Sequence, residues 1–195
     1  MLIVAALYHF TRFEDPAALR AAWDAFFAAA RALAAAPMPV VAAMSGHAPA
    51  GGCVLALCCD YRVMARGDVR IGLNETQVGL VAPEGIQRLL RRVVGARQAE
   101  RLLVGGLLLD SEEALHVGLV DALAEAHEVT AQAQQWLGTL LALPRAPMLD
   151  TRAIARADLI EALAPEHLDL DRLIAAWNSP DTQAGLQALA ARLRR

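Results

Sequence analysis

The chain has 195 residues, a net charge of −3, and a composition that is 56% hydrophobic and 20% charged. This length fits one domain with a core of its own, and the high apolar fraction excludes a disordered chain. The weak negative charge offers no basic surface for nucleic acid, and no uninterrupted apolar run reaches the roughly 18 residues of a membrane span. We therefore expect a soluble, cytoplasmic protein that binds neither nucleic acid nor membrane.

The three cysteines, Cys53, Cys58 and Cys59, lie close together in an apolar run. Their number is odd, and their spacing lacks the companion ligands of a zinc site. We expect buried, reduced thiols and no bound metal.

The first predicted helix begins after Asp15, an N-cap acceptor followed by a proline that suits the first helical position. Apolar side chains then recur at helical spacing as far as Leu33, and Pro37 and Pro39 end the pattern. This order of elements is typical of an α/β fold. The segments that follow are a buried strand, a buried helix and two short strands, at 40–44, 51–59, 61–65 and 69–71.

The second half of the chain is predicted to be mostly helical. A helix from Pro83 ends at Gly95, and a second covers 96–104. Ser111 is predicted to cap a short third helix that closes at Gly118. The amphipathic faces of these helices are typical of surfaces that pack on a neighbouring subunit. Further helices are predicted at 128–143, 165–178 and from Ser179-Pro180 to the end.

A Gly/Pro loop, Ala48-Pro49-Ala50-Gly51-Gly52, joins the strand at 40–44 to the apolar helix. Free N–H groups at a helix N-terminus attract anions, and glycine lets a substrate approach the backbone closely. Such a loop could hold a developing enolate oxygen. The alternative is a tight turn in which glycine only relieves crowding, and the loop taken alone favours that alternative.

Glu75 is the candidate acid or base. It lies in an uncharged segment, with no cation within three residues. Apolar surroundings disfavour the ionised form of a carboxyl, which suits a general base that works near neutral pH. The alternative is an exposed loop glutamate, and the residues alone support both interpretations equally.

Other polar side chains receive structural interpretations. A hydrogen bond to the backbone is favoured for His47 over a role as base, and Asp60 is predicted to order a turn. A solvated helix face is predicted for Arg88, Arg91 and Arg92, with contact to a phosphate-bearing cofactor as the alternative.

Taken together, these motifs resemble the crotonase superfamily, the enoyl-CoA hydratase/isomerase fold. The resemblance covers the chain from about Pro16 onward. It implies an α/β fold with a crotonase-like (ClpP/crotonase) spiral β-core over 1–125 and a helical C-terminal trimerisation region over 126–195. The segments that carry it are Pro39–Ala43, Gly51-Gly52, Cys59–Arg62, Gly79-Leu80, Gly95, Glu113–Leu115, Gly118–Asp121 and Ser179–Asp181.

Within the superfamily, Pro49–Cys53 and Gly72–Gln77 resemble the mitochondrial-type Δ3–Δ2 enoyl-CoA isomerases. The resemblance implies that Glu75 is the single catalytic acid/base and that the Gly51 N–H belongs to an oxyanion hole. It implies no permanent cofactor, because coenzyme A enters only as part of the acyl thioester substrate. The further substrate-binding residues that it implies are Ala50, Gly52 and Asn74.

Hydratases of this superfamily carry a second glutamate three residues after the oxyanion glycine, where this chain has Val54. Adding water needs two carboxylates, whereas moving a proton along an allylic system needs one. The expected reaction is therefore the isomerisation of 3-enoyl-CoA to trans-2-enoyl-CoA in fatty acid β-oxidation. Hydration or another crotonase activity is the alternative.

The family pattern includes several strands ahead of the helix that begins here at Pro16, and a loop that supplies a second oxyanion N–H and helps to hold coenzyme A. Relative to that pattern the N-terminal strands are missing, which implies a start assigned too late or a shortened member. For the chain as written we expect a weak or silent catalyst with an unsatisfied sheet edge at 40–44. The resemblance also implies a homo-oligomer, a trimer or a dimer of trimers.

Overall fold

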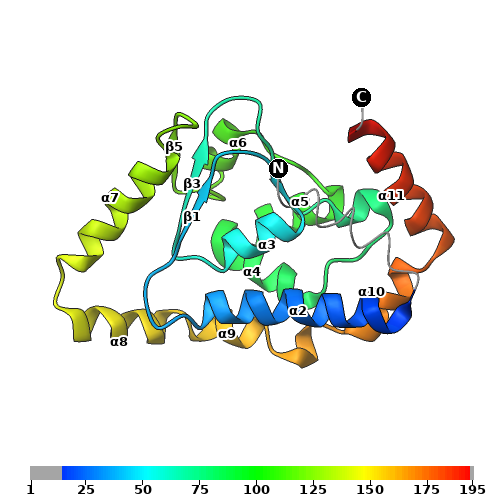
Figure 1. Ribbon diagram of the computed structural model, residues 1–195, viewed down its shortest axis with the longest axis horizontal. Helices are drawn as coiled ribbons and strands as arrows, with labels where there is room; N and C mark the ends of the chain where they lie inside the picture. The colour runs from blue at the N-terminus through cyan, green and yellow to red at the C-terminus, as the bar shows by residue number, and fades with distance from the viewer. Residues whose placement is uncertain (1–14, 194–195) are drawn as a thin grey trace.

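The computed structural model describes residues 15–193, which fold into two small parallel sheets surrounded by helices (Figure 1). The larger sheet has the order β1-β3-β5. Parallel pairing sets Met44 opposite Met64 and Ala65 opposite Ala124. The α/β class predicted from the sequence is therefore confirmed. The strands are β1 (Val41–Met44), β2 (Ala48–Pro49), β3 (Tyr61–Ala65), β4 (Ile71–Gly72) and β5 (Ala122–Ala124).

Helix α2 (Pro16–Ala34) starts as predicted, with the Asp15 side chain accepting a hydrogen bond of 2.9 Å from the Ala17 N–H. Its buried face carries Leu19, Trp23 and Phe27, which join the main core. Figure 1 shows α2 running below α3 (Gly51–Leu57) and α4 (Glu84–Val94). The helix therefore covers one side of the core that lies around α3.

All three cysteines lie on α3 or directly after it. All are buried, and none forms a disulfide bond with another described residue. Burial raises the pKa of Cys58 to about 12 and the pKa of Cys59 to about 11, and it raises that of Cys53 further. The thiols therefore stay protonated at physiological pH, and their burial agrees with the prediction from the sequence. Helix α3 itself ends at Leu57, two residues before the predicted end.

The strand predictions need three corrections. The strand at 40–44 is β1, which is half-buried and has Ala43 exposed, so the expectation of full burial is wrong. The strand expected at 69–71 lies at Ile71–Gly72 instead. Strands β2 and β5 were not predicted, because segments of two or three residues are too short to show a period of two.

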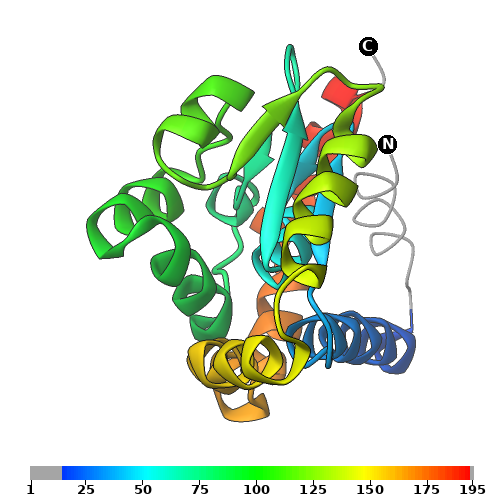
Figure 2. The ribbon, with the colours of Figure 1, turned by 90° about the vertical axis from the view of Figure 1, so that its left-hand side faces the viewer.

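Helices cover both faces of the larger sheet, as Figure 2 shows. Helix α7 (Val129–Leu141) packs on one face, where Val129 and Ala133 form a small second core with Val63 and Ala65. Helix α5 (Ala96–Gly105) follows α4, and α6 (Ser111–His116) leads back toward β5. Ser111 does not cap α6: the cap is Asp110, whose carboxylate accepts from the Glu113 N–H while the Glu113 side chain accepts from the Asp110 N–H. This reciprocal capping box satisfies two backbone donors, which a serine one residue later would not do.

The C-terminal part is helical, but its division differs from the prediction. Two helices after α7 were not predicted, α8 (Arg145–Ala155) and α9 (Ala157–Ala162). The single helix expected at 165–178 is wrong, since a short 3₁₀ turn at Pro165–His167 precedes α10 (Leu170–Trp177). Asp169, with φ of 40°, breaks the helical path and caps α10 through the Arg172 N–H. The last helix is α11 (Pro180–Leu193).

Asp60 connects the C-terminal helices to the core. Its carboxylate accepts hydrogen bonds from the Val40 N–H at 2.7 Å, from Arg152 at 2.7 and 2.8 Å and from Arg156 at 3.1 Å. The two guanidinium groups also donate to carbonyl oxygens of Ala36 and Cys58. Asp60 therefore does more than order a turn, because it joins the start of β1 and the end of α3 to α8 and α9.

Candidate active site

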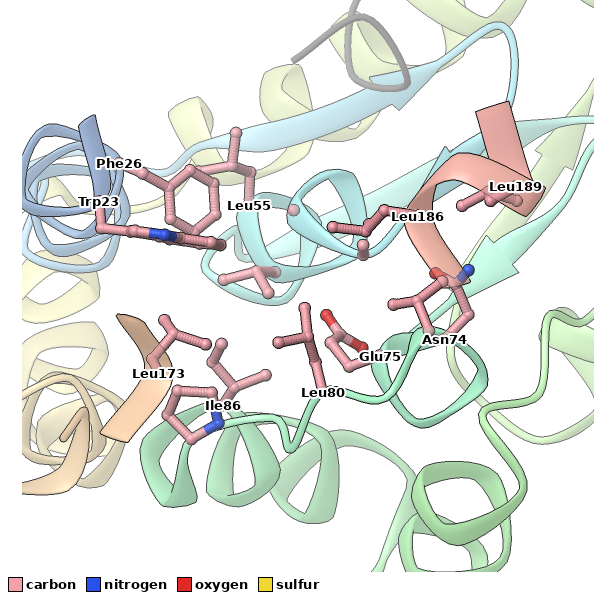
Figure 3. Close-up of a pocket in the computed structure, with 15 residues that line it drawn as sticks. Trp23, Phe26, Leu55, Asn74, Glu75, Leu80, Ile86, Leu173, Leu186 and Leu189 are labelled. Atoms are coloured by element: carbon pink, nitrogen blue, oxygen red, sulfur yellow. The ribbon is translucent and has the colours of Figure 1, made fainter. Parts of the chain in front are cut away.

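A cavity of about 130 Å³ lies between α2, α3, α10, α11 and the segment that precedes α4 (Figure 3). Its walls are almost entirely apolar. Among the described residues that line it, the polar side chains are those of Asn74 and Glu75. An apolar cavity with a few polar groups that can orient a ligand is typical of small-molecule binding sites.

Glu75 is the first residue of the 3₁₀ turn η1 (Glu75–Val78). Its Oε2 atom is shielded from solvent and has no hydrogen-bond partner among the described residues. In Figure 3 the carboxyl group points into the cavity, beside Leu80. Burial raises the pKa of Glu75 from 4.5 to about 7, against a smaller opposite effect of its own backbone N–H. The group can therefore take up and release a proton near neutral pH.

Contacts from three directions hold η1 in place. Gly79 ends the turn with φ of 79°, a left-handed conformation that glycine adopts without strain, and the Leu80 N–H donates to the Glu75 carbonyl at 3.0 Å. The Thr76 hydroxyl donates to the Leu103 carbonyl of α5 at 2.8 Å. From α11, the Thr182 hydroxyl donates to the Gly79 carbonyl at 3.1 Å. The position of the Glu75 carboxyl is thus fixed by α5 and α11 together.

The Gly/Pro loop reaches the cavity next to Glu75. Its Ala50 N–H donates to the Gly72 carbonyl at 2.8 Å, and Ala50 has φ of 48° and ψ of −116°, a conformation strained for any residue with a Cβ. The N–H groups of Gly51 and Gly52 donate to no backbone acceptor within residues 15–193. Ala50 and Gly51 line the cavity, whereas Gly52 is buried and does not line it. Among the described residues the Gly51 N–H therefore has no backbone acceptor, and Gly51 lines the same cavity as Glu75.

Four of the five candidate residues predicted from the sequence thus meet at one cavity: Glu75, Gly51, Ala50 and Asn74. Val54 lies one helical turn after Gly51, is 1% exposed and also lines the cavity. A longer side chain at this position would extend into the cavity that Glu75 also lines.

Sequence reasoning missed the rest of the wall. Figure 3 shows that it comes from helices far apart in the chain, with Trp23 and Phe26 on α2 and Leu173 on α10 at one end. Leu186 and Leu189 of α11 lie toward the other end, next to Asn74. The only sequence signal for these residues is helical periodicity, which indicates a buried face without saying that the face encloses a cavity.

The remaining polar candidates lie outside the cavity. His47 accepts a hydrogen bond of 3.1 Å from the Arg70 N–H through Nδ1, as predicted. Arg88 pairs with Glu84 and Glu161, and Arg92 pairs with Asp158. Arg91 is exposed. Through Arg88 and Arg92, α4 therefore forms ion pairs with α9.

The described residues contain neither a metal-binding cluster nor a membrane-spanning helix. No group of three or more His, Cys, Asp or Glu side chains within 15–193 is arranged to hold a metal ion. In the same range, no helix has both the length and the apolar character needed to cross a membrane.

The chain is similar to known proteins in sequence and in fold. The model of the family described as "Enoyl-CoA hydratase/isomerase" matches residues 12–194. Human mitochondrial enoyl-CoA delta isomerase 1 is 36% identical over 157 residues, which are 80% of this chain and 52% of that protein. The mouse protein of the same name is 45% identical over 108 residues, or 55% of this chain and 37% of that protein. The chain thus spans about half, or less, of the length of these curated relatives.

Solved structures resemble the fold over most of the chain. The crystal structure of human mitochondrial Δ3–Δ2 enoyl-CoA isomerase matches with a TM-score of 0.85 and 33% identity, covering 94% of this chain and 72% of that one. An enoyl-CoA hydratase from Mycobacterium avium subsp. paratuberculosis K-10 matches with a TM-score of 0.73 and 31% identity, covering 84% and 66%. Both activities therefore occur among proteins that share this arrangement of strands and helices.

Proposed function

Because the chain belongs to the enoyl-CoA hydratase/isomerase family of enzymes, with the crotonase-like α/β fold, we propose that it converts 3-enoyl-CoA thioesters to trans-2-enoyl-CoA. One observation carries the proposal: a single titratable side chain, Glu75, lines the described part of the cavity, and its pKa is about 7. Moving a double bond by one position requires one group that removes a proton and returns it elsewhere.

In the proposed reaction, ionised Glu75 removes a proton from C2, between the thioester carbonyl and the C3–C4 double bond. The electron pair of the broken C–H bond spreads over a dienolate, whose oxygen accepts a hydrogen bond from the Gly51 N–H. Glu75, now neutral, returns the proton at C4, which leaves the double bond between C2 and C3. The apolar walls keep water away, so the proton stays on Glu75 between the two steps. Coenzyme A takes part only as the thioester group of the substrate.

Hydration is the competing activity within the family, and the side chain at Val54 argues against it. Adding water needs a second group that orients and activates the water molecule. Val54 occupies the place where the superfamily's hydratases carry that group, and it offers no polar atom. Asn74 can donate a hydrogen bond but cannot act as a base at neutral pH.

The test compares two reactions in the same preparation: isomerisation of 3-hexenoyl-CoA and hydration of crotonyl-CoA. We expect isomerisation without comparable hydration, and a loss of about 10²–10⁴ in isomerase turnover for Glu75→Gln. Glu100→Gln, on the exposed face of α5, serves as the matched control and should keep full turnover. Undiminished turnover in Glu75→Gln would exclude the assigned role, and the absence of both activities would indicate a silent homologue.

A further inference from the structure

The cavity has a polar end and an apolar end. Figure 3 places Asn74 at one end, Glu75 and Leu80 near the middle, and Trp23, Phe26 and Leu173 at the other end. A thioester is polar. In the proposed reaction its carbonyl lies close to the Gly51 N–H and the Glu75 carboxyl. The hydrocarbon tail therefore has its complementary surface at the ring-walled end, where every described lining side chain is apolar.

The ring-walled end is held rigidly. The Trp23 ring stacks on Phe27 with centroids 5.9 Å apart, and it meets Trp177 edge-on at 5.5 Å. Phe26 meets Trp23 at 6.0 Å in an edge-to-face arrangement. Trp23, Phe27 and Trp177 are all buried, so close packing limits movement of the Trp23 indole ring to the side that faces the cavity. The far wall of the cavity is therefore fixed by packing between α2 and α10.

The size of the cavity limits what this end can hold. Its volume of about 130 Å³ is close to the roughly 150 Å³ of an apolar protein cavity that accommodates benzene, a molecule with six carbon atoms. A short acyl tail fits in this space. A longer chain has to displace the rings or leave through the partly exposed edge.

We propose that Trp23 and Phe26 form a length stop that makes the protein selective for short acyl chains of about six carbons. This inference rests on the proposed function, because it assumes that the cavity takes the acyl part of an acyl-CoA thioester. It identifies α2 as the element that determines substrate length, through two side chains that have no part in the proton transfer.

Direct binding of saturated acyl-CoA thioesters tests the length stop without requiring turnover. Calorimetric titration with butyryl-, hexanoyl-, octanoyl- and dodecanoyl-CoA should give an affinity that rises about fourfold per methylene up to hexanoyl. Beyond octanoyl the affinity should level off or fall. In Phe26→Ala the affinity should keep rising with chain length to at least octanoyl-CoA. Leu55→Phe narrows the same end of the cavity, so its affinity should stop rising at a shorter chain than in the unmodified protein.

Leu33→Ala is the matched control, because Leu33 is a half-buried apolar residue of the same helix that neither lines the cavity nor belongs to the ring cluster. It should lower stability without moving the length at which affinity stops rising. If Phe26→Ala does not fold, Phe26→Leu makes a smaller opening in the same direction. An affinity that keeps rising through dodecanoyl-CoA in the unmodified protein would overturn the inference. So would an affinity that stops rising at the same chain length in Phe26→Ala, in Leu55→Phe and in the unmodified protein.

Turnover with 3-hexenoyl-, 3-octenoyl- and 3-dodecenoyl-CoA separates the two hypotheses. Equal turnover at all lengths keeps the isomerase function and overturns the length stop. A clear break in binding with no turnover at any length keeps the length stop and overturns the isomerase function.

Discussion

The Glu75 carboxyl lies in a buried, mostly apolar cavity, where its ionised form is unfavourable. Its Oε2 has neither solvent nor a described hydrogen-bond partner, so the neutral form is favoured in the folded protein. An isolated carboxyl of this kind destabilises the fold at neutral pH. Its presence in a cavity whose other described lining side chains, Asn74 apart, are apolar therefore points to a role in chemistry rather than in stability.

The first prediction concerns stability against pH. The folded pKa of Glu75, about 7, lies above the ordinary value of 4.5, so the folded protein holds this proton more tightly than the unfolded chain does. The resulting stability is fully present below about pH 4.5 and is lost as the pH rises through about 7, by roughly 3 kcal/mol. Glu75→Gln removes this dependence and should be more stable than the unmodified protein at pH 8. Denaturant unfolding at several pH values measures both; a parallel pH dependence in the two proteins would contradict the prediction.

The second prediction concerns Val54. Val54→Glu places a second carboxyl in the cavity, and we expect weak hydration of crotonyl-CoA that the unmodified protein lacks. The buried, unpaired group should lower stability by about 2 kcal/mol or more. Val54→Gln is the control, because it has a similar shape but no base, and it should not hydrate. Efficient hydration by the unmodified protein would show that Val54 does not decide between the two reactions.

Residue patterns alone identified only part of the site. Glu75 stood out as a carboxyl in an uncharged segment, but its burial depends on α11 and α5, which lie more than twenty residues away in the chain. Gly51, Ala50 and Asn74 entered through resemblance to a family. The ring wall could not be predicted, because Trp23 and Leu173 meet only after the chain has folded.

At the scale of elements, the sequence located helices that carry their own start and stop signals. Helix α2 has Asp15-Pro16 at its start, and α4 has Gly95 at its end. Strands β2 and β5 have no local signal, because their pairing partners β4 and β3 define them. Helix α8 was missed because it has no buried residue in the described chain, so its sequence shows no clear apolar face.

The third prediction tests how α8 and α9 are joined to the core. Asp60→Ala leaves two half-buried or buried guanidinium groups, those of Arg152 and Arg156, without their carboxylate. We expect a loss of about 3–5 kcal/mol in the free energy of unfolding. Asp158→Asn breaks the more exposed pair with Arg92 and should cost less than about 1 kcal/mol. Chemical denaturation of both variants checks the order; equal losses would contradict it.

At the scale of the whole molecule, the helices α7 and α8 stand out from the core in Figure 1. Leu141 is 76% exposed and Ile154 is 78% exposed, and Leu143 is exposed between them. Exposed apolar side chains thus lie at both ends of α8, and such exposure is typical of a surface covered in an assembly. We propose that a second copy of this chain covers them, in line with the homo-oligomer, a trimer or a dimer of trimers, expected from the sequence.

The fourth prediction tests this surface. Leu141→Glu combined with Ile154→Glu should shift the protein toward the monomer in sedimentation velocity, because two charges would be buried at the contact. Neither residue contributes to the core, so the helical circular dichroism spectrum should not change. Val104→Glu, on α5 and 71% exposed, is the control and should keep the assembly intact. A monomeric unmodified protein, or an unchanged mass in the double variant, would contradict the proposal.

The buried thiols on α3 have a practical consequence. Alkylating reagents react with thiolates that they can reach, so none of Cys53, Cys58 and Cys59 should be modified while the core stays closed. The rate of labelling at each position then reports how often the segment directly behind the Gly51 loop opens. A ligand that fills the cavity should slow labelling of Cys53 in particular, since Cys53 follows the loop most closely. Mass spectrometry of alkylated Cys53, Cys58 and Cys59 can therefore measure local opening of the core next to the site, without any engineered label.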